Sequence, residues 1–121
     1  MKSWIVLGAS LAALAVALGA FGAHGLKNRV TPADLIIFET GVKYQMYHAL
    51  GLILIGILGF HYNSNIIQTP AVLLSIGTLI FSGSLYILVF TGLRWMGAIT
   101  PIGGILLVSG WGMLVFHLLK S

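Results

Sequence analysis

The stretch that decides the fold is YQMYHALGLILIGILGFHYNSNIIQTPAVLLSIGTLIFSGSLYILVFTGL, from Tyr44 to Leu93, because it contains no Asp, Glu, Lys or Arg. It is long enough to cross a bilayer twice, since about 20 helical residues span the hydrocarbon core. A segment with several polar residues interrupts it at 61–70. Charge is equally absent at 3–26 and 95–119. Such runs fit lipid, so the sequence predicts an all-α integral membrane protein.

The composition excludes several classes of function. Hydrophobic residues make up 59% of the 121-residue chain and charged residues 7%, whereas soluble domains carry about 25% charged residues. The net charge is +4, but six scattered Lys and Arg residues do not form the basic face that binds nucleic acid. The chain has no cysteine, which excludes disulfides, thiolate metal ligands and thiol nucleophiles.

Four membrane spans are expected, and together they form a single domain of residues 1–121. The spans are expected at about 4–23, 44–60, 70–90 and 97–118. The later connections are short, so the second, third and fourth spans should be antiparallel neighbours. Small residues recur every three or four positions along the first span, which predicts a face for close helix packing: Gly8, Ala12, Ala15, Gly19 and Ala23.

The first connection is expected to contain an additional interfacial amphipathic helix at about 32–43. Thr31 can cap this helix, Pro32 suits its first position and Asp34 lies three residues after the cap. Apolar residues then recur at helical spacing on a segment that also holds charged residues. We expect this helix to continue into the second span, with a bend at Gly41.

Most of the chain's charged residues lie in or near this connection, which makes it the place to look for a site. Glu39 and Lys43 are four residues apart and can pair on one helix surface. The third connection lies on the same side of the membrane, so Arg94 is predicted to pair with Asp34 or Glu39. The candidate polar cluster is His24, Glu39, Lys43, Tyr44, Gln45, His48 and Arg94.

The sequence gives no basis for a catalytic residue, a metal site or a cofactor. His24, Glu39 and His48 could supply three ligands to a zinc ion, but their spacing lacks the close pairs typical of such sites. The serines of the third span are expected to support helix packing. Four aromatic residues are interpreted as mostly belonging to the aromatic belt at the membrane interface: Trp4, Tyr62, Trp95 and Trp111.

The distribution of Lys and Arg predicts the orientation in the cell (inner or plasma) membrane, where the chain is expected to be a multi-pass protein. Loops one and three carry four basic residues, namely Lys27, Arg29, Lys43 and Arg94, against two on the opposite side, Lys2 and Lys120. Because basic residues are enriched on the cytoplasmic side, loops one and three are expected in the cytoplasm.

Four motifs resemble a known family: GAFGAHGLK (19–27), FETGVKYQMYHALGL (38–52), FSGSLYILVFTG (81–92) and RWMGAITPIGG (94–104). They closely resemble the domain of unknown function 423 family, small membrane proteins that include the transmembrane protein 256 relatives. The resemblance covers nearly the whole chain and implies a membrane-embedded fold. It implies no reaction, ligand or partner.

The leading hypothesis is a non-enzymatic membrane protein: a structural, accessory, or small-ligand- or lipid-binding component. Its expected partners are the lipid bilayer and either a second copy or another membrane protein. The alternative is a small transporter or channel that works as an oligomer, although no span core holds an acidic residue. A third hypothesis is a membrane enzyme with His48 as the base and Glu39 as its partner.

Overall fold

The structure, a computed structural model, describes residues 2–121 and contains four long α-helices. They are α1 (Lys2–Phe21), α2 (Pro32–Leu58), α3 (Ser64–Thr91) and α4 (Thr100–Lys120). Two short segments lie between them, the π-helical η1 (Gly22–Leu26) and the 3₁₀ helix η2 (Arg94–Ala98). The four long helical segments are long and apolar enough to cross a membrane, which confirms the expected all-α, four-span architecture.

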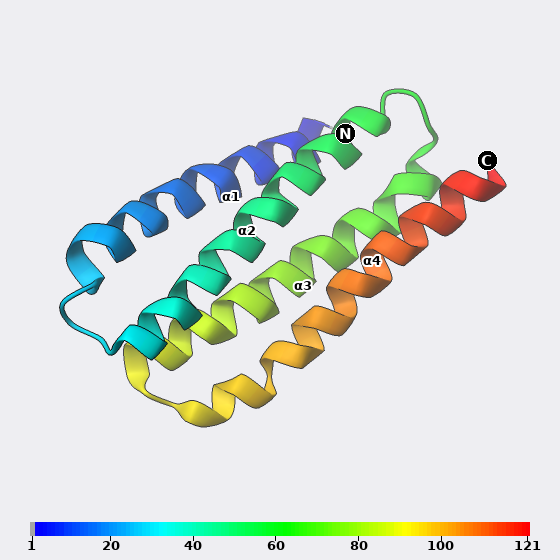
Figure 1. Cartoon of the computed structure of the whole chain (residues 1–121). Coiled ribbons are helices and arrows are strands. Elements are labelled where there is room, and N and C mark those ends of the chain that lie inside the picture. Colours follow the sequence, from blue (N-terminus) through cyan, green and yellow to red (C-terminus); the bar gives the residue numbers. More distant parts are fainter. Residues whose placement is uncertain (1) are drawn as a thin grey trace.

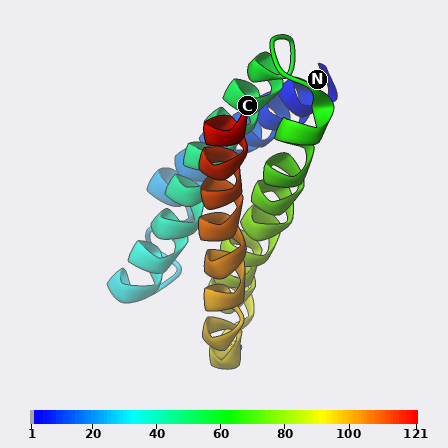
Figure 2. The same cartoon turned by 90° about the vertical axis from the view of Figure 1, so that its right-hand side faces the viewer.

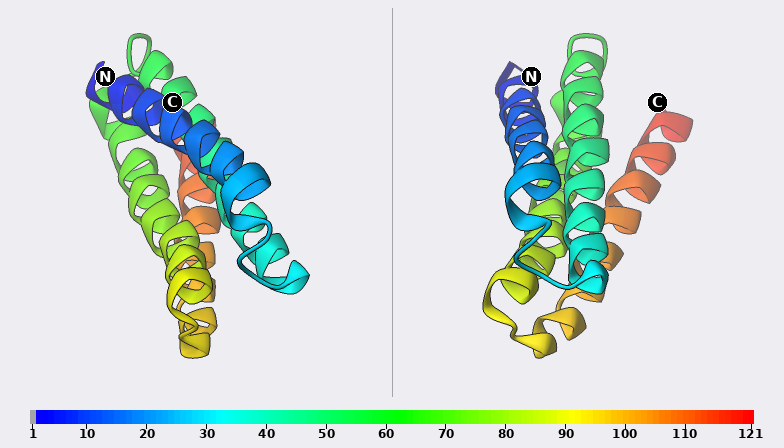
Figure 3. Two further views of the ribbon diagram at one scale, coloured as in Figure 1. Left: turned by 90° about the vertical axis from the view of Figure 1, so that its left-hand side faces the viewer. Right: turned by 60° about the vertical axis from the view of Figure 1, so that its left-hand side comes forward.

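Helices that follow one another in the sequence pack antiparallel, α1 on α2, α2 on α3 and α3 on α4 (Figure 1). Both termini and the α2–α3 connection lie at one end of the molecule, and the other two connections lie at the opposite end (Figure 1). The α1–α2 pair is inclined to the α3–α4 pair (Figure 2). Toward its C-terminus α4 leans away from α2 (Figure 3), so the four helices form an open array.

Two clusters of buried apolar side chains hold the array together. The larger cluster joins α2, α3 and α4 toward the end that holds the termini, and consists of Leu52, Ile55, Ile67, Ala71, Leu74, Leu107 and Leu114. The smaller one, at the other end, consists of Leu26, Phe38, Leu88 and Val89. The ring of Phe38 is fully buried and lies against the rings of Tyr86 and Phe90, with centroids 5.4 and 5.7 Å away.

Glycines allow the closest contacts between helices, as expected for a bundle in lipid. A Cβ atom at Gly8 of α1 would lie 2.6 Å from the Ala49 carbonyl oxygen of α2. A Cβ atom at Gly103 of α4 would overlap the backbone of Phe81 in α3 and lie 2.9 Å from the Gly77 carbonyl oxygen. Because these neighbours are backbone atoms within helices, they cannot move aside cheaply. The small-residue face expected for the first span is used at Gly8 and at the buried Ala15.

The segment at 32–43 is helical, but it is not a separate interfacial helix. Thr31 caps it through a hydrogen bond from the Asp34 backbone N–H to its side chain (3.1 Å), and Pro32 opens the helix, as expected. The helix then runs unbroken through Gly41 to Leu58. Gly41 is a packing position, because a Cβ there would lie 2.8 Å from the Tyr86 ring, and its carbonyl accepts a hydrogen bond from Ser82 (2.7 Å).

Helix α3 begins at Ser64, six residues before the expected start of the third span, so Pro70 lies inside it. Proline has no N–H, and Pro70 therefore leaves the carbonyl of Ile66, four residues earlier, without its usual helical donor. Nδ1 of His117 in α4 lies 2.8 Å from that carbonyl oxygen. Since a carbonyl can only accept, the ring donates from Nδ1, and His117 replaces the donor that the proline removes.

Glycine substitutions test the close approach of α3 and α4. We expect Gly103→Ala to lower the free energy of unfolding by about 1–3 kcal/mol, because the added methyl group has to displace α3 backbone. Gly112→Ala in the same helix is the matched control, since a Cβ there meets no atom within 4 Å. Reversible unfolding in mixed micelles measures both. Equal stability of the two variants would contradict the close approach of α3 and α4 at Gly103.

A double-mutant cycle tests the contact between His117 and the carbonyl freed by Pro70. We expect His117→Phe to cost about 1 kcal/mol of stability in the natural chain, because it leaves that carbonyl unpaired. In a Pro70→Ala background the helix supplies its own N–H, so the cost of His117→Phe should shrink or disappear. A cost that is the same in both backgrounds would show that the two residues act independently.

Candidate functional site

An ion pair joins the two charged connections at the end of the molecule opposite the termini. Nη1 and Nη2 of Arg94 donate to Oδ1 and Oδ2 of Asp34, each at 2.9 Å, in a bidentate arrangement. Asp34 lies in the first turn of α2, where the helix dipole also favours a negative charge. The predicted link between the first and third connections is confirmed, with Asp34 as the partner and not Glu39. It fixes the start of α2 to η2.

Gln45 belongs to a hydrogen-bonded network in the interior of the bundle. Its Nε2 donates to the Leu11 carbonyl of α1 (2.8 Å), and its Oε1 accepts from the Tyr86 hydroxyl of α3 (2.7 Å). One buried side chain of α2 therefore connects three helices. Each partner is within hydrogen-bond distance, so this network stabilises the helix arrangement.

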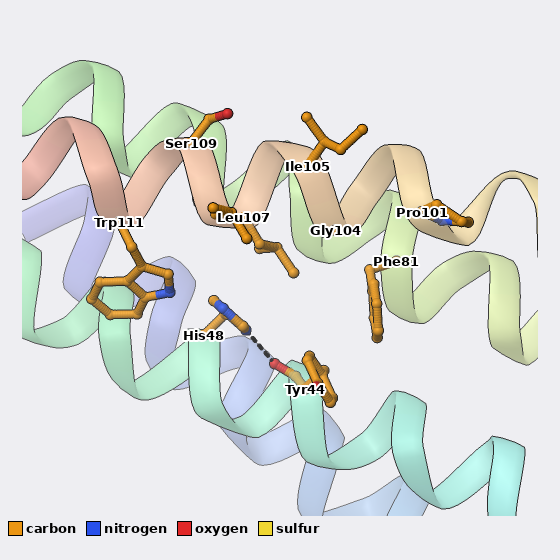
Figure 4. Close-up of a pocket in the computed structure, with 10 residues that line it drawn as sticks. Tyr44, His48, Phe81, Pro101, Gly104, Ile105, Leu107, Ser109 and Trp111 are labelled. Carbon is orange, nitrogen blue, oxygen red and sulfur yellow. Dashed lines mark hydrogen bonds between the residues drawn. The ribbon is translucent and has the colours of Figure 1, made fainter.

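Tyr44 and His48 face in a different direction and line a cavity of about 620 Å³, a groove between α2 and α4 (Figure 4). The lining is mostly apolar and aromatic. It consists of Tyr44, His48, Phe81, Pro101, Gly104, Ile105, Leu107, Val108, Ser109 and Trp111. The groove exists because the backbone of α4 packs closely on α3 and reaches α2 only through side chains, and we call it the α2–α4 groove.

Aromatic rings form the two ends of the α2–α4 groove (Figure 4). Tyr44 is stacked on Phe81, with centroids 4.5 Å apart and an angle of 26° between the planes. At the other end the Trp111 ring extends from α4 toward α2, 5.9 Å from the His48 ring and against Gly51. A side chain at Gly51 would meet this indole ring, so glycine gives Trp111 its place.

His48 is the buried polar residue of the groove, and its hydrogen bond within α2 determines which ring nitrogen carries the proton. Nδ1 lies 2.7 Å from the carbonyl oxygen of Tyr44, one helical turn earlier. That oxygen can only accept, so Nδ1 carries the proton. In the neutral ring Nε2 is then an acceptor. The groove thus offers mainly apolar surface, with one nitrogen able to accept a hydrogen bond from a bound molecule.

The structure does not bring the other members of the candidate polar cluster together. His24 in η1, and Glu39 and Lys43 in α2, are exposed. The expected Glu39–Lys43 pair is absent, since the ion pair between Asp34 and Arg94 is the one found within residues 2–121. The zinc site considered for His24, Glu39 and His48 is not formed either. No three His, Asp or Glu residues in this described range lie close enough to hold a metal ion.

Sequence reasoning missed the α4 side of the groove. The interpretation of Trp111 as an interfacial belt residue is wrong, because Trp111 lies near the middle of α4 (Thr100–Lys120) and contacts His48 and Gly51. The position of Trp111 in the sequence could have indicated this. A tryptophan about ten residues from either end of a span is too deep for the membrane interface.

These features define a class: an integral membrane protein of four antiparallel helices with a lateral, mainly apolar groove. Residues 18–104 match the family model described as "Protein of unknown function (DUF423)", and the chain belongs to this family.

Full-length relatives agree with this membership. The chain is 50% identical over 120 residues to a UPF0382 membrane protein of Staphylococcus saprophyticus, covering 99% of each chain. It is 46% identical over 121 residues to the UPF0382 membrane protein YwdK of Bacillus subtilis, covering 99% of this chain and 98% of the relative. No solved structure gives a significant match.

The Gln45 network predicts different effects for two tyrosines that lie on α2 and α3. We expect Tyr86→Phe to lower the free energy of unfolding by about 1–2 kcal/mol, because it leaves the Gln45 carbonyl buried without its donor. Tyr44→Phe is the matched control, since the Tyr44 hydroxyl makes no hydrogen bond to residues 2–121. Unfolding in mixed micelles compares them. A larger loss for Tyr44→Phe would contradict the network.

Proposed function

We propose that this protein is a non-catalytic, lipid-binding component of the membrane, and that the α2–α4 groove receives an acyl or prenyl chain. The observation that carries this proposal is the groove itself, an apolar and aromatic cavity of about 620 Å³ between two spanning helices. Ligand sites in proteins are concave, mostly apolar and equipped with few polar groups, as here.

The position of the groove favours a lipid as the occupant. It opens between two spans, and Ile105 and Val108 on its rim are exposed on the surface that faces the bilayer. Lipid chains surround this surface at high concentration, so entry needs no passage through a polar layer. An apolar chain also restores the packing contacts that the separation of α4 from α2 leaves unmade.

The polar groups of the groove support binding more than catalysis. General acid–base catalysis by His48 would need a positioned partner, and the membrane enzyme hypothesis assigned that role to Glu39. Glu39 does not line the groove, and no acidic residue does. Nδ1 of His48 is already held by the Tyr44 carbonyl. We therefore assign no catalytic residue.

A small transporter or channel is the second candidate, and His48 is the observation in its favour. An ionisable side chain within a membrane span often marks a transport path. His48 lies near the middle of α2 and is buried beside an open groove. The groove lining is mainly apolar and has no Asp, Glu, Lys or Arg and no second His, which favours the binding of a lipid chain over the passage of ions.

We also propose a location in the cell membrane with the α1–α2 and α3–α4 connections on the cytoplasmic side. Lys27 and Arg29 precede α2 and Arg94 follows α3, whereas Lys2 and Lys120 lie at the opposite end. The excess of basic residues at the first end supports this orientation. Within the membrane the partner of the chain is a second copy or another membrane protein, and exposed polar groups on α2 support such an association.

Photocrosslinking tests lipid binding. The protein is reconstituted in phosphatidylcholine vesicles containing a phosphatidylcholine with a diazirine on its acyl chain, irradiated, and mapped by mass spectrometry. We expect adducts to concentrate on groove residues, with Gly104→Leu reducing them roughly fivefold because the new side chain occupies the groove. A Cβ at Gly104 makes ordinary contacts of 3.8 and 3.9 Å with the Phe81 ring, so the fold should tolerate the change.

Gly112→Leu is the matched control, because a Cβ there has no neighbouring group within 4 Å. It should leave the groove adducts unchanged. Adducts spread evenly over all lipid-facing residues, or groove adducts unaffected by Gly104→Leu, would overturn the proposed function.

A further inference from the structure

One outward side of α2 carries polar side chains where the other spans are apolar. Glu39, Lys43 and Tyr47 follow one another at intervals of four residues, so they form a ridge along the helix. We call these three residues the α2 ridge. Each is exposed, Tyr47 to 56%. None makes an ion pair or a hydrogen bond through its side chain within residues 2–121.

The α2 ridge lies along the N-terminal part of α2, a helix that is long and apolar enough to cross a membrane. Lys43 lies nine residues beyond Asp34, which is about 13 Å along the helix at 1.5 Å per residue. Tyr47 lies one turn further along. On α1 and α3, exposed residues at a similar distance from the end of the molecule that holds Asp34 are apolar, as at Val16 and Leu79. Charged groups facing lipid chains are costly, so the ridge needs a partner.

We propose that the α2 ridge is the contact surface between two copies of this chain, related by a two-fold axis along the membrane normal. Glu39 of each copy then pairs with Lys43 of the other. A two-fold contact places the same patch on both copies, so a surface that carries one acid and one base on adjacent turns is complementary to itself. Both charges of each copy are neutralised at once, and Tyr47 comes to lie between the two helices.

Charge favours a second copy over an anionic lipid headgroup as the occupant. Lys43 alone could extend toward a lipid phosphate at the interface. Glu39 lies between Lys43 and that interface on the same ridge, and it would repel the phosphate. A second copy offers a positive charge to Glu39 and a negative one to Lys43.

This inference rests on the proposed association of the chain within the membrane and does not depend on lipid binding. The groove uses Tyr44 and His48, whereas the ridge uses the neighbouring outward side of α2. The two surfaces adjoin at one point, where the Tyr47 ring lies 5.6 Å from the Tyr44 ring.

The chain contains no cysteine, so a single introduced cysteine reports on its own position. Tyr47→Cys is placed on the ridge and Val115→Cys on the outer side of α4, and the two natural side chains are almost equally exposed, at 56% and 57%. Full-length protein is oxidised in phosphatidylcholine vesicles. We expect disulfide-linked dimer from Tyr47→Cys to exceed that from Val115→Cys at least roughly fivefold, as two-fold symmetry brings like positions together.

Charge exchange tests the pairing itself. Dye-labelled Val115→Cys copies in vesicles report association by energy transfer. We expect Glu39→Lys, and separately Lys43→Glu, to weaken association roughly fivefold by placing like charges together. The combined variant Glu39→Lys with Lys43→Glu should restore it, because each copy again offers one acid and one base. Circular dichroism checks that the variants fold.

The outcomes distinguish two claims, that the copies associate and that they associate through the α2 ridge. Energy transfer without Tyr47 disulfides would show that the copies associate through another surface, which overturns this inference alone. No energy transfer above that of a non-associating control would overturn self-association as well. Disulfides that persist at the same level after either single charge reversal would remove the Glu39–Lys43 pairing.

Discussion

Contact between helices in lipid has to be made without a hydrophobic force, and the rest of this structure depends on how that is achieved. Lipid tails are as apolar as the helix surfaces, so separating the helices exposes nothing to water. Contact therefore relies on close backbone approach at Gly8 and Gly103, and on side chains that hydrogen-bond across helices. Gln45 and Ser82 bind partners on neighbouring helices, and Asp34 and Arg94 fasten one end.

The contacts are not equally close between all pairs of helices, and this produces the α2–α4 groove. Contacts join α1 to α2, α2 to α3 and α3 to α4, while α4 and α2 are separated by side chains. Trp111 fills part of the gap against Gly51, and the remainder is the cavity beside His48. An acyl or prenyl chain fits such a space better than a polar solute does, which is why lipid binding is the proposed function.

The overall architecture followed from the sequence because uncharged runs as long as a bilayer is thick have few alternatives. The cap at Thr31 and the pairing of Arg94 with a carboxylate of the first connection were predictable for the same local reasons, since turn chemistry and membrane side restrict the partners. The direction in which each residue of the polar cluster points was not. Tyr44, Gln45 and His48 are close in sequence, yet Gln45 faces the interior and the other two face the groove. Helical position relative to α3 and α4 decides this, and only the assembled helices reveal it.

The contact of His117 with the Ile66 carbonyl makes the residues at positions 70 and 117 depend on each other. A proline within a helix removes one backbone hydrogen bond, and here the His117 ring, near the end of α4, supplies a donor in its place. This hydrogen bond is useful only while both residues are present. Without His117 the Ile66 carbonyl has no donor, and without Pro70 the helix supplies the donor itself. Among sequences of this fold, the two positions are therefore expected to change together, a trace of α3–α4 contact that can be read without any structure.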